Sequence, residues 1–191
     1  MAAAVTTIAA LFIAVLSVRH ASRLSGLVER ATYIGFALPG IVIALALVFF
    51  AVNFAAPVYQ TLGLLIFAYL VLFLSQPVGS IRSSLLQINP RVEEAAGSLG
   101  ASPVKVLGTV TVPLLRPGIL GGAALVFLTA MKELPATLIL SPIGFKTLAI
   151  SIWSATADGL LGRAAVAALV LILVSSVPMA FLVLRERREI R

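Results

Sequence analysis

The chain has 191 residues, of which 61% are hydrophobic and 11% are charged. A soluble domain is about half apolar and about a quarter charged, so this composition excludes an ordinary soluble protein and indicates one embedded in a lipid bilayer. The net charge is +7, but the basic residues are scattered between apolar runs and form no clustered face, so we predict no nucleic-acid partner. The chain contains no cysteine, which excludes disulfides and thiolate chemistry.

Five apolar runs are predicted to be membrane spans within a single transmembrane domain, residues 1–191. A helix that crosses a hydrocarbon core of about 30 Å needs about 20 residues, and the first run is at the short limit. This run has no positive segment before it and no convincing cleavage site, which disfavours a signal peptide. The predicted spans are residues 2–18, 33–54, 62–78, 117–134 and 164–184, with a polar loop at 79–116 and an outer segment at 135–163.

The distribution of lysine and arginine predicts the orientation of these spans. Eleven of the fourteen basic residues fall after the first run, in the loop 79–116 and in the tail from Arg185 to Arg191. The other three are Lys132, Lys146 and Arg163. Because cytoplasmic loops carry the excess of Lys and Arg, the loop 79–116 and the C-terminus are predicted to be cytoplasmic. An odd number of spans then places the N-terminus outside, which suggests that upstream sequence is missing.

A polar island within the cytoplasmic loop predicts two short helices joined by a tight turn. Asn89 suits the cap of the first helix and Pro90 its first position. Glu93 and Glu94 lie in its early turns, where the helix dipole favours negative charge. Gly100 is predicted to end this helix at a position where φ is often positive.

The second helix of the island repeats the same start signals. Ser102 and Pro103 provide its cap and first residue, and Pro113 is predicted to end it. On the first helix, a stripe of mostly small residues would let another surface approach closely. This stripe is Val92, Ala95, Ala96 and Leu99. On composition alone, a cytoplasmic loop with some helix in it explains the island equally well.

The spacing of the island resembles the EAA motif of the membrane subunits of binding-protein-dependent ABC importers. Glu94, the following alanine pair, Gly100 and Pro113 all match that motif, and Val110 and Val112 stand where the family usually has Ile and Leu. In that family the motif forms a coupling helix that docks into a groove of the cytoplasmic ATPase subunit. The resemblance implies an ATPase-coupling role for a set of loop residues. They are Glu93, Glu94, Ala95, Ala96, Gly100, Ala101, Pro103 and Pro113.

The segment after the fourth run carries ionisable groups at the edge of a predicted span. Such groups usually face a partner or a water-filled cavity, so Lys132 and Glu133 are candidates for the translocation pathway, and Glu133 suits a cation. Pro135 and Trp153 are candidates for an outer gate, Trp153 on an amphipathic helix near the headgroups. A surface connector, with Glu133 among the headgroups, is the other interpretation.

The same segment resembles the permeases of the ferric-iron importer subfamily. The matching stretches are MKELPATLIL, GFKTLA and, earlier in the chain, FALPGIVIAL. Those permeases are often one chain with two homologous halves, so the resemblance suggests a C-terminal half. Relatives that move thiamine, polyamines, phosphonates or sulfate share the EAA loop, and the cargo therefore stays open among these solutes.

Together these features predict an all-α integral membrane protein with about five transmembrane helices of the MetI-like importer permease core. The resemblance implies a bacterial inner membrane location and three protein partners: a cytoplasmic ABC ATPase dimer, a second permease subunit or half, and a periplasmic or lipid-anchored substrate-binding protein. The sequence has no Gly-x-x-x-x-Gly-Lys-Ser/Thr loop and no catalytic constellation, so we expect no enzyme, no metal site and no bound cofactor, with ATP and Mg on the partner. An ion-gradient-driven secondary transporter and a non-transporting scaffold are the alternatives from other classes.

Overall fold

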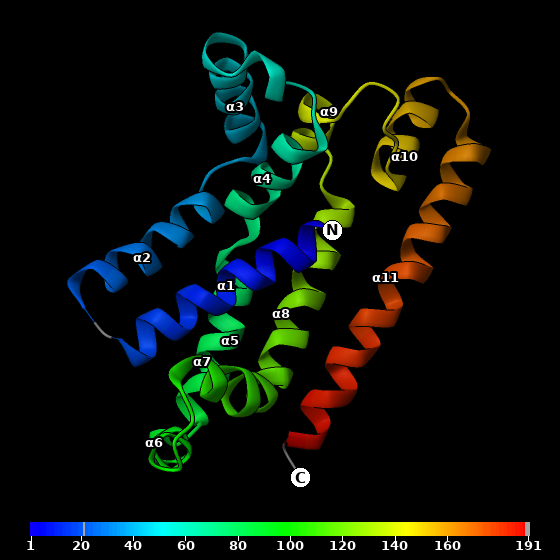
Figure 1. Cartoon of the computed structure of the whole chain (residues 1–191). Coiled ribbons are helices and arrows are strands. Elements are labelled where there is room, and N and C mark those ends of the chain that lie inside the picture. Colours follow the sequence, from blue (N-terminus) through cyan, green and yellow to red (C-terminus); the bar gives the residue numbers. More distant parts are fainter. Residues whose placement is uncertain (21, 190–191) are drawn as a thin grey trace.

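The computed structural model describes residues 1–20 and 22–189, and within this part the chain is helical without strands (Figure 1). This confirms the predicted all-α class. The side chains of the predicted basic tail, Arg185 to Arg191, lie outside the part described. The elements are α1 (Ala2–Arg19), α2 (Arg23–Ala37), α3 (Gly40–Phe54), η1 (Ala56–Val58), α4 (Leu62–Phe73), α5 (Ser75–Gln87), α6 (Pro90–Ser98), α7 (Pro103–Val106), η2 (Leu107–Thr111), α8 (Val112–Lys132), α9 (Pro135–Leu140), α10 (Leu148–Ala157) and α11 (Leu161–Glu189).

Two apolar clusters hold the bundle together. The first joins α3, α4, α8 and α9 around Leu65, Val126 and Leu140, which are almost inaccessible to solvent. The second joins α1, α5 and α8 around Ile81, Leu85 and Leu115. Because α8 contributes to both clusters, it is the central helix of the fold.

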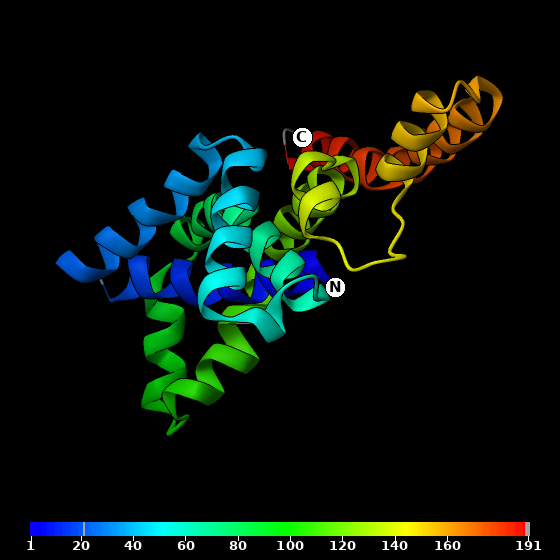
Figure 2. The same ribbon diagram turned by 90° about the horizontal axis from the view of Figure 1, so that it is seen from above.

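The last two helices, α10 and α11, pack mainly on each other and contact the bundle through α8. Figure 2 shows that α10 and α11 form a hairpin to one side, with α11 packed mainly on α10 and touching α8. Large apolar side chains on α11, such as Leu173, are exposed, and so are Phe12 on α1 and Phe49 on α3. Exposed apolar side chains in such numbers suit contact with lipid or with another membrane protein.

Two predicted spans are broken in the structure. The run 33–54 is not one helix, because α2 and α3 meet at 106° around Leu38 and Pro39. Proline disfavours helical backbone in the residue before it, and Leu38 is extended with φ −94° and ψ 139°. The run 62–78 is divided into α4 and α5, which meet at 53° beside Leu74. Helix α5 then continues to Gln87, so residues 79–87 are helical rather than loop.

The predicted end of the second island helix at Pro113 is wrong. The chain is continuously helical from Pro103 to Lys132 through α7, the π-helical turn η2 and α8. Proline is tolerated where a helical segment begins, and Pro113 lies in the first turn of α8, directly after the π turn. The helix that contains the fourth predicted span therefore begins at Pro103 and not at Pro117.

Among the described residues, three helices are long and apolar enough to cross a membrane, or up to five if each bent pair forms one span. The three are α1, the continuous helix from Pro103 and the first part of α11, and the bent pairs are α2 with α3 and α4 with α5. Five is also the number of apolar runs in the sequence, and their placement in a membrane stays a prediction.

Two glycines of α8, Gly118 and Gly122, bring α5 and α8 into direct backbone contact. A Cβ atom added at Gly122 would lie 2.8 Å from the Cα atom of Pro77, and one at Gly118 would lie 2.4 Å from Oγ of Ser84. The hydroxyl of Ser80 donates a hydrogen bond of 2.9 Å to the carbonyl of Gly118. The helices that enter and leave the polar island are thus fixed to each other.

Candidate functional site

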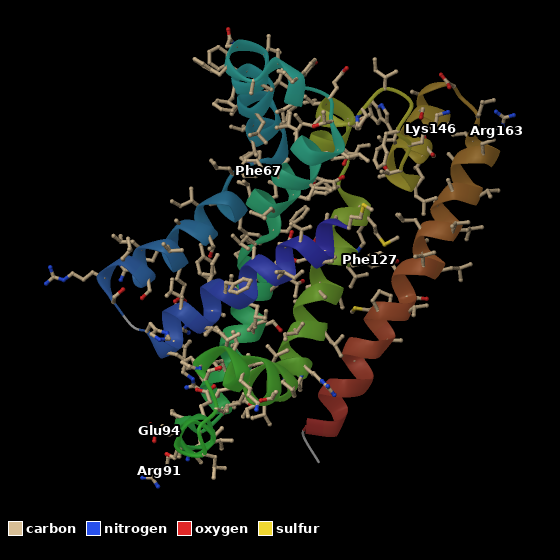
Figure 3. The ribbon with its side chains drawn as sticks, viewed as in Figure 1. Phe67, Arg91, Glu94, Phe127, Lys146 and Arg163 are labelled. Atoms are coloured by element: carbon tan, nitrogen blue, oxygen red, sulfur yellow. The ribbon has the colours of Figure 1, made fainter. Side chains whose placement is uncertain are left out.

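The polar island forms a compact loop at one end of the molecule. Helix α5 leads into it, α6 and α7 form its tip, and the continuous helix through α8 leads back toward the other end (Figure 1). The C-terminal ends of α1 and α11 lie at the same end of the molecule as this loop. Figure 3 shows Arg91 and Glu94 at the tip, pointing away from the bundle, with Lys146 and Arg163 at the opposite end. This separation agrees with the charge asymmetry of the sequence.

The start and stop signals of the loop act as the sequence predicts. The side chain of Asn89 accepts a hydrogen bond from the backbone N–H of Arg91, and that of Ser102 accepts one from Lys105. Gly100 follows α6 with φ at +85°, and a Cβ atom there would meet nothing within 4 Å. A side chain at this position would therefore strain the backbone and project into open space.

The loop has an outer face rich in exposed apolar and small side chains. Leu99 is 89% exposed and Val104 is 80% exposed. No residue of α6 is fully buried, and Glu94 is exposed beside Ala95. Exposed apolar side chains around a charged one, on a rigid pair of helix ends, form a surface suited to docking against another protein.

Glu93 is half-buried, unlike the exposed Glu94, and ties the loop to the bundle. One of its carboxylate oxygens lies 2.8 Å from Nε of Arg19, at the end of α1. The other oxygen accepts a hydrogen bond of 2.8 Å from the hydroxyl of Thr111, in η2. Glu93, which the sequence places among the coupling residues, is thus an inward contact, whereas Glu94 remains free for an outward one.

An open groove of about 460 Å³ runs between the end of α1 and the loop. Its walls are mostly apolar, and Arg19 and Glu93 lie in it together. Of the predicted coupling residues, the groove brings together Glu93, Glu94, Ala101 and Pro103, whereas Pro113 lies further along in α8. The remaining lining residues are Val15, His20, Gly97, Val104, Val106, Leu107 and Thr111.

At the opposite end, Glu133 lies in the turn between α8 and α9. Its Oε1 atom accepts a hydrogen bond of 3.1 Å from the backbone N–H of Ala136. A Cβ atom added at Gly40 would lie 2.8 Å from the same oxygen, so the carboxylate also lies against the start of α3. Carboxylates are favourable at helix N-termini, and Glu133 therefore has a structural partner within the chain.

The other candidates of the outer segment are distributed over three elements. Lys132 is exposed at the end of α8, and Pro135 is the first residue of α9. Trp153 is 53% exposed on α10, which packs mainly against α11. Lys132, Glu133 and Pro135 therefore share one turn, while Trp153 belongs to the separate hairpin. Within the part that the structure describes, no three His, Asp or Glu side chains are grouped so as to hold a metal ion.

Several contacts escape prediction from the sequence because they join distant segments. Arg19 and Thr111 carry no motif that marks them as partners of Glu93. An ion pair of 3.0 Å between Arg82 of α5 and Glu29 of α2 is likewise unmarked. The only available signal for Arg19 is its place in the last turn of a helix, where a cation is favourable.

Comparison with known proteins agrees with this arrangement. A family model described as "binding-protein-dependent transport system inner membrane component" matches residues 6–191. The chain is 39% identical over 95% of its length to the Fe(3+)-transport system permease protein FbpB 2 of Haemophilus influenzae, of which it covers 36%. It is 31% identical over 75% of its length to the putative 2-aminoethylphosphonate transport system permease protein PhnV of Salmonella typhimurium, of which it covers 54%.

A shorter stretch is 44% identical to the molybdenum transport system permease protein ModB of Haemophilus influenzae, over 32% of the chain and 27% of that relative. The chain thus spans about a third to about half of the length of the first two relatives. The family match covers the helical bundle, the polar loop and the α10–α11 hairpin alike. The chain belongs to the family of inner membrane components of binding-protein-dependent transport systems.

Proposed function

We propose that this chain is the membrane-spanning part of an ATP-driven importer and that α6 and α7 dock on a cytoplasmic ATPase. The observation that carries this proposal is the two-faced loop: Glu93 fixes its inner face to the bundle, while Leu99 and Val104 leave its outer face apolar and exposed. Exposed apolar side chains on a helix that carries a docking-like motif support a protein partner at this face. The ATPase supplies ATP and Mg, and the chain itself binds no cofactor.

In this mechanism, closure of two ATPase subunits around ATP moves the seated loop as a rigid body. The movement passes into α5 and α8, the two helices that flank the loop. Their contact at Gly118 and Gly122 leaves no space for independent sliding, so the two helices move together. The spans then rock and switch the pathway between outward and inward access.

Ferric iron is the cargo that we propose first. The relative named for Fe(3+) transport matches 95% of the chain, and the match includes the turn at Glu133 and the segment that follows it. A second candidate is 2-aminoethylphosphonate, because the relative named for it matches 75% of the chain at 31% identity. These two solutes are therefore the ones to compare in uptake assays.

The working assembly includes a second permease subunit or half and a periplasmic or lipid-anchored binding protein. The exposed apolar surfaces of α3 and α11 support a further membrane partner. The positive-inside rule supports a cytoplasmic position for the loop, for the C-terminus and for the end of α1. Trp153, Lys132 and Pro135 then face the outer side, where the binding protein docks.

The test is capture of the ATPase from membranes by the tagged protein and by its Gly100→Trp variant. The indole would project from the docking face, so we expect the variant to insert into the membrane but to lose the ATPase and the uptake of cargo. Gly144→Trp is the matched control, because Gly144 also has positive φ, at +82°, and open space around it. It carries the same backbone strain but lies in the outer segment.

Capture of an ATP-hydrolysing subunit by the unaltered protein and by Gly144→Trp, but not by Gly100→Trp, supports the proposal. Equal capture by all three proteins contradicts the docking face. If gentle solubilisation of the unaltered protein captures no ATP-hydrolysing subunit, the importer mechanism itself fails. Uptake of radiolabelled ferric iron and of 2-aminoethylphosphonate by the same cells then distinguishes the two cargoes.

A further inference from the structure

The loop formed by α6 and α7, called the docking loop from here on, has few apolar contacts with the bundle. Helix α6 buries none of its residues, and an open groove separates the loop from the end of α1. A helix with no buried face is not held by packing, so its orientation depends on other interactions. The polar contacts of Glu93 span the groove at this point.

The carboxylate of Glu93 connects α6 with two other segments, the end of α1 and the turn η2. Its Oε2 atom lies 2.8 Å from Nε of Arg19, and its Oε1 atom accepts the hydroxyl hydrogen bond of Thr111. The guanidinium of Arg19 also donates a hydrogen bond of 3.2 Å to the carbonyl of Ile88, in the link between α5 and α6. The end of α1, the entry to α6 and the π turn before α8 are therefore connected through this pair.

The pair is sheltered from water. The exposed fractions of the two side chains are 15% for Arg19 and 17% for Glu93. Charges that are partly removed from water interact more strongly than exposed ones, and removing one partner leaves the other poorly solvated. The ion pair between Arg82 and Glu29 is more open, because the side chain of Arg82 is 44% exposed.

We propose that Arg19 and Glu93 act as a positioning joint, which transmits movement of α6 to α1 and to the start of α8 during transport. This inference rests on the proposed importer function and adds a residue pair outside the docking face. Glu94 contacts the partner, whereas Glu93 holds the helix that carries Glu94 at a fixed angle to the bundle. Without the joint, α6 still binds the ATPase but swings against the bundle, so ATP hydrolysis continues with less transport.

The first test measures the joint without any partner. Hydrogen exchange of the backbone amides in α6 is compared between the unaltered protein and its Glu93→Gln and Glu94→Gln variants in the same detergent. We expect faster exchange in α6 for Glu93→Gln and no change for Glu94→Gln, since the exposed carboxylate holds nothing in place. Equal exchange in all three proteins overturns the inference, whatever the function of the chain.

The second test measures coupling in vesicles that contain the permease with its ATPase and binding protein. The variants are Glu93→Gln, Arg19→Gln and the double variant, with Glu29→Gln as the control ion-pair variant. The readout is the amount of ferric iron or 2-aminoethylphosphonate imported per ATP hydrolysed. We expect this ratio to fall by about fivefold or more in both single variants, with no further fall in the double variant.

The two tests separate the failure of this inference from the failure of the proposed function. If the unaltered protein imports neither solute with ATP, the proposed importer function fails and the coupling role of the joint fails with it. If the unaltered protein imports one of them and Glu93→Gln lowers the ratio no more than Glu29→Gln does, only the joint is refuted. Independent effects of Glu93→Gln and Arg19→Gln, multiplying in the double variant, also refute it.

Discussion

The contact between α5 and α8 predicts that Gly122→Ala destabilises the protein. A Cβ atom at position 122 would lie 2.8 Å from both Cα and Cβ of Pro77. Non-bonded carbon atoms prefer a separation of about 3.5–4.0 Å, so the helices must separate by about 1 Å at this point. Neither neighbouring atom can rotate away, because one belongs to the backbone and the other to a proline ring.

Overpacking of this kind typically costs about 1–3 kcal/mol, while replacing a helical glycine by alanine recovers about 0.5–1 kcal/mol. We therefore expect Gly122→Ala to lower the free energy of unfolding by about 1–2 kcal/mol. Gly26→Ala is the matched control, because Gly26 is also helical but a Cβ atom there meets nothing within 4 Å. Gly26→Ala is therefore expected to gain the stabilisation of a helical alanine without the cost of overpacking.

The assay is thermal unfolding of the purified protein in detergent, followed by circular dichroism. A loss of 1–2 kcal/mol corresponds to a decrease of a few degrees in Tm, roughly 2–4 °C per kcal/mol for a chain of this size. If Gly122→Ala melts at the same temperature as Gly26→Ala, or above it, the helices are not in the close contact described. Transport by Gly122→Ala is expected to decrease as well, since α5 and α8 flank the docking loop.

Two further predictions concern the outer turn and the contact between α2 and α4. Glu133→Ala is expected to cost about 0.5–2 kcal/mol, because the N–H of Ala136 loses its acceptor, whereas Glu133→Gln keeps an acceptor oxygen and costs less. Melting measures both costs, and loss of ferric-iron uptake in Glu133→Gln at unchanged stability would identify a pathway role for the charge instead. Gly35→Ala is expected to prevent accumulation of folded protein in the membrane, because its Cβ atom would lie 1.9 Å from the carbonyl oxygen of Val71. The amount of each variant in membranes is measured by immunoblotting. The control is Gly63→Ala, whose Cβ atom would make only an ordinary contact at 3.6 Å. Equal amounts of Gly35→Ala and Gly63→Ala in the membrane would contradict the prediction.

The sequence predicts the docking loop well because its signals are local. A cap acts on amides two or three residues away, so Asn89 and Ser102 are recognisable without any knowledge of the fold. The same holds for Gly100, whose positive φ follows from the end of a helix. The stretch that resembles the importer motif is also continuous in the sequence.

Predictions fail where tertiary contacts decide the local structure. Residues 79–87 look like loop because they include several serines and Arg82, yet Val78, Ile81 and Leu85 form a buried stripe against α1 and α8. Pro113 looks like a helix end, but the π turn before it lets the helix continue. The partners of Glu93 come from segments far away in the sequence, and no pattern of short range contains them.

The neighbouring carboxylates Glu93 and Glu94 illustrate how one short helix presents two different surfaces. Consecutive residues on a helix point about 100° apart, so the same turn presents one charge to the bundle and the other to solvent. Apolar packing of α6 against the bundle would instead cover the small residues of the proposed docking surface. Attachment through a sheltered ion pair leaves those residues exposed and still fixes the angle of the helix. This division explains why the loop combines a polar inner contact with an apolar outer face, the reverse of a soluble surface helix.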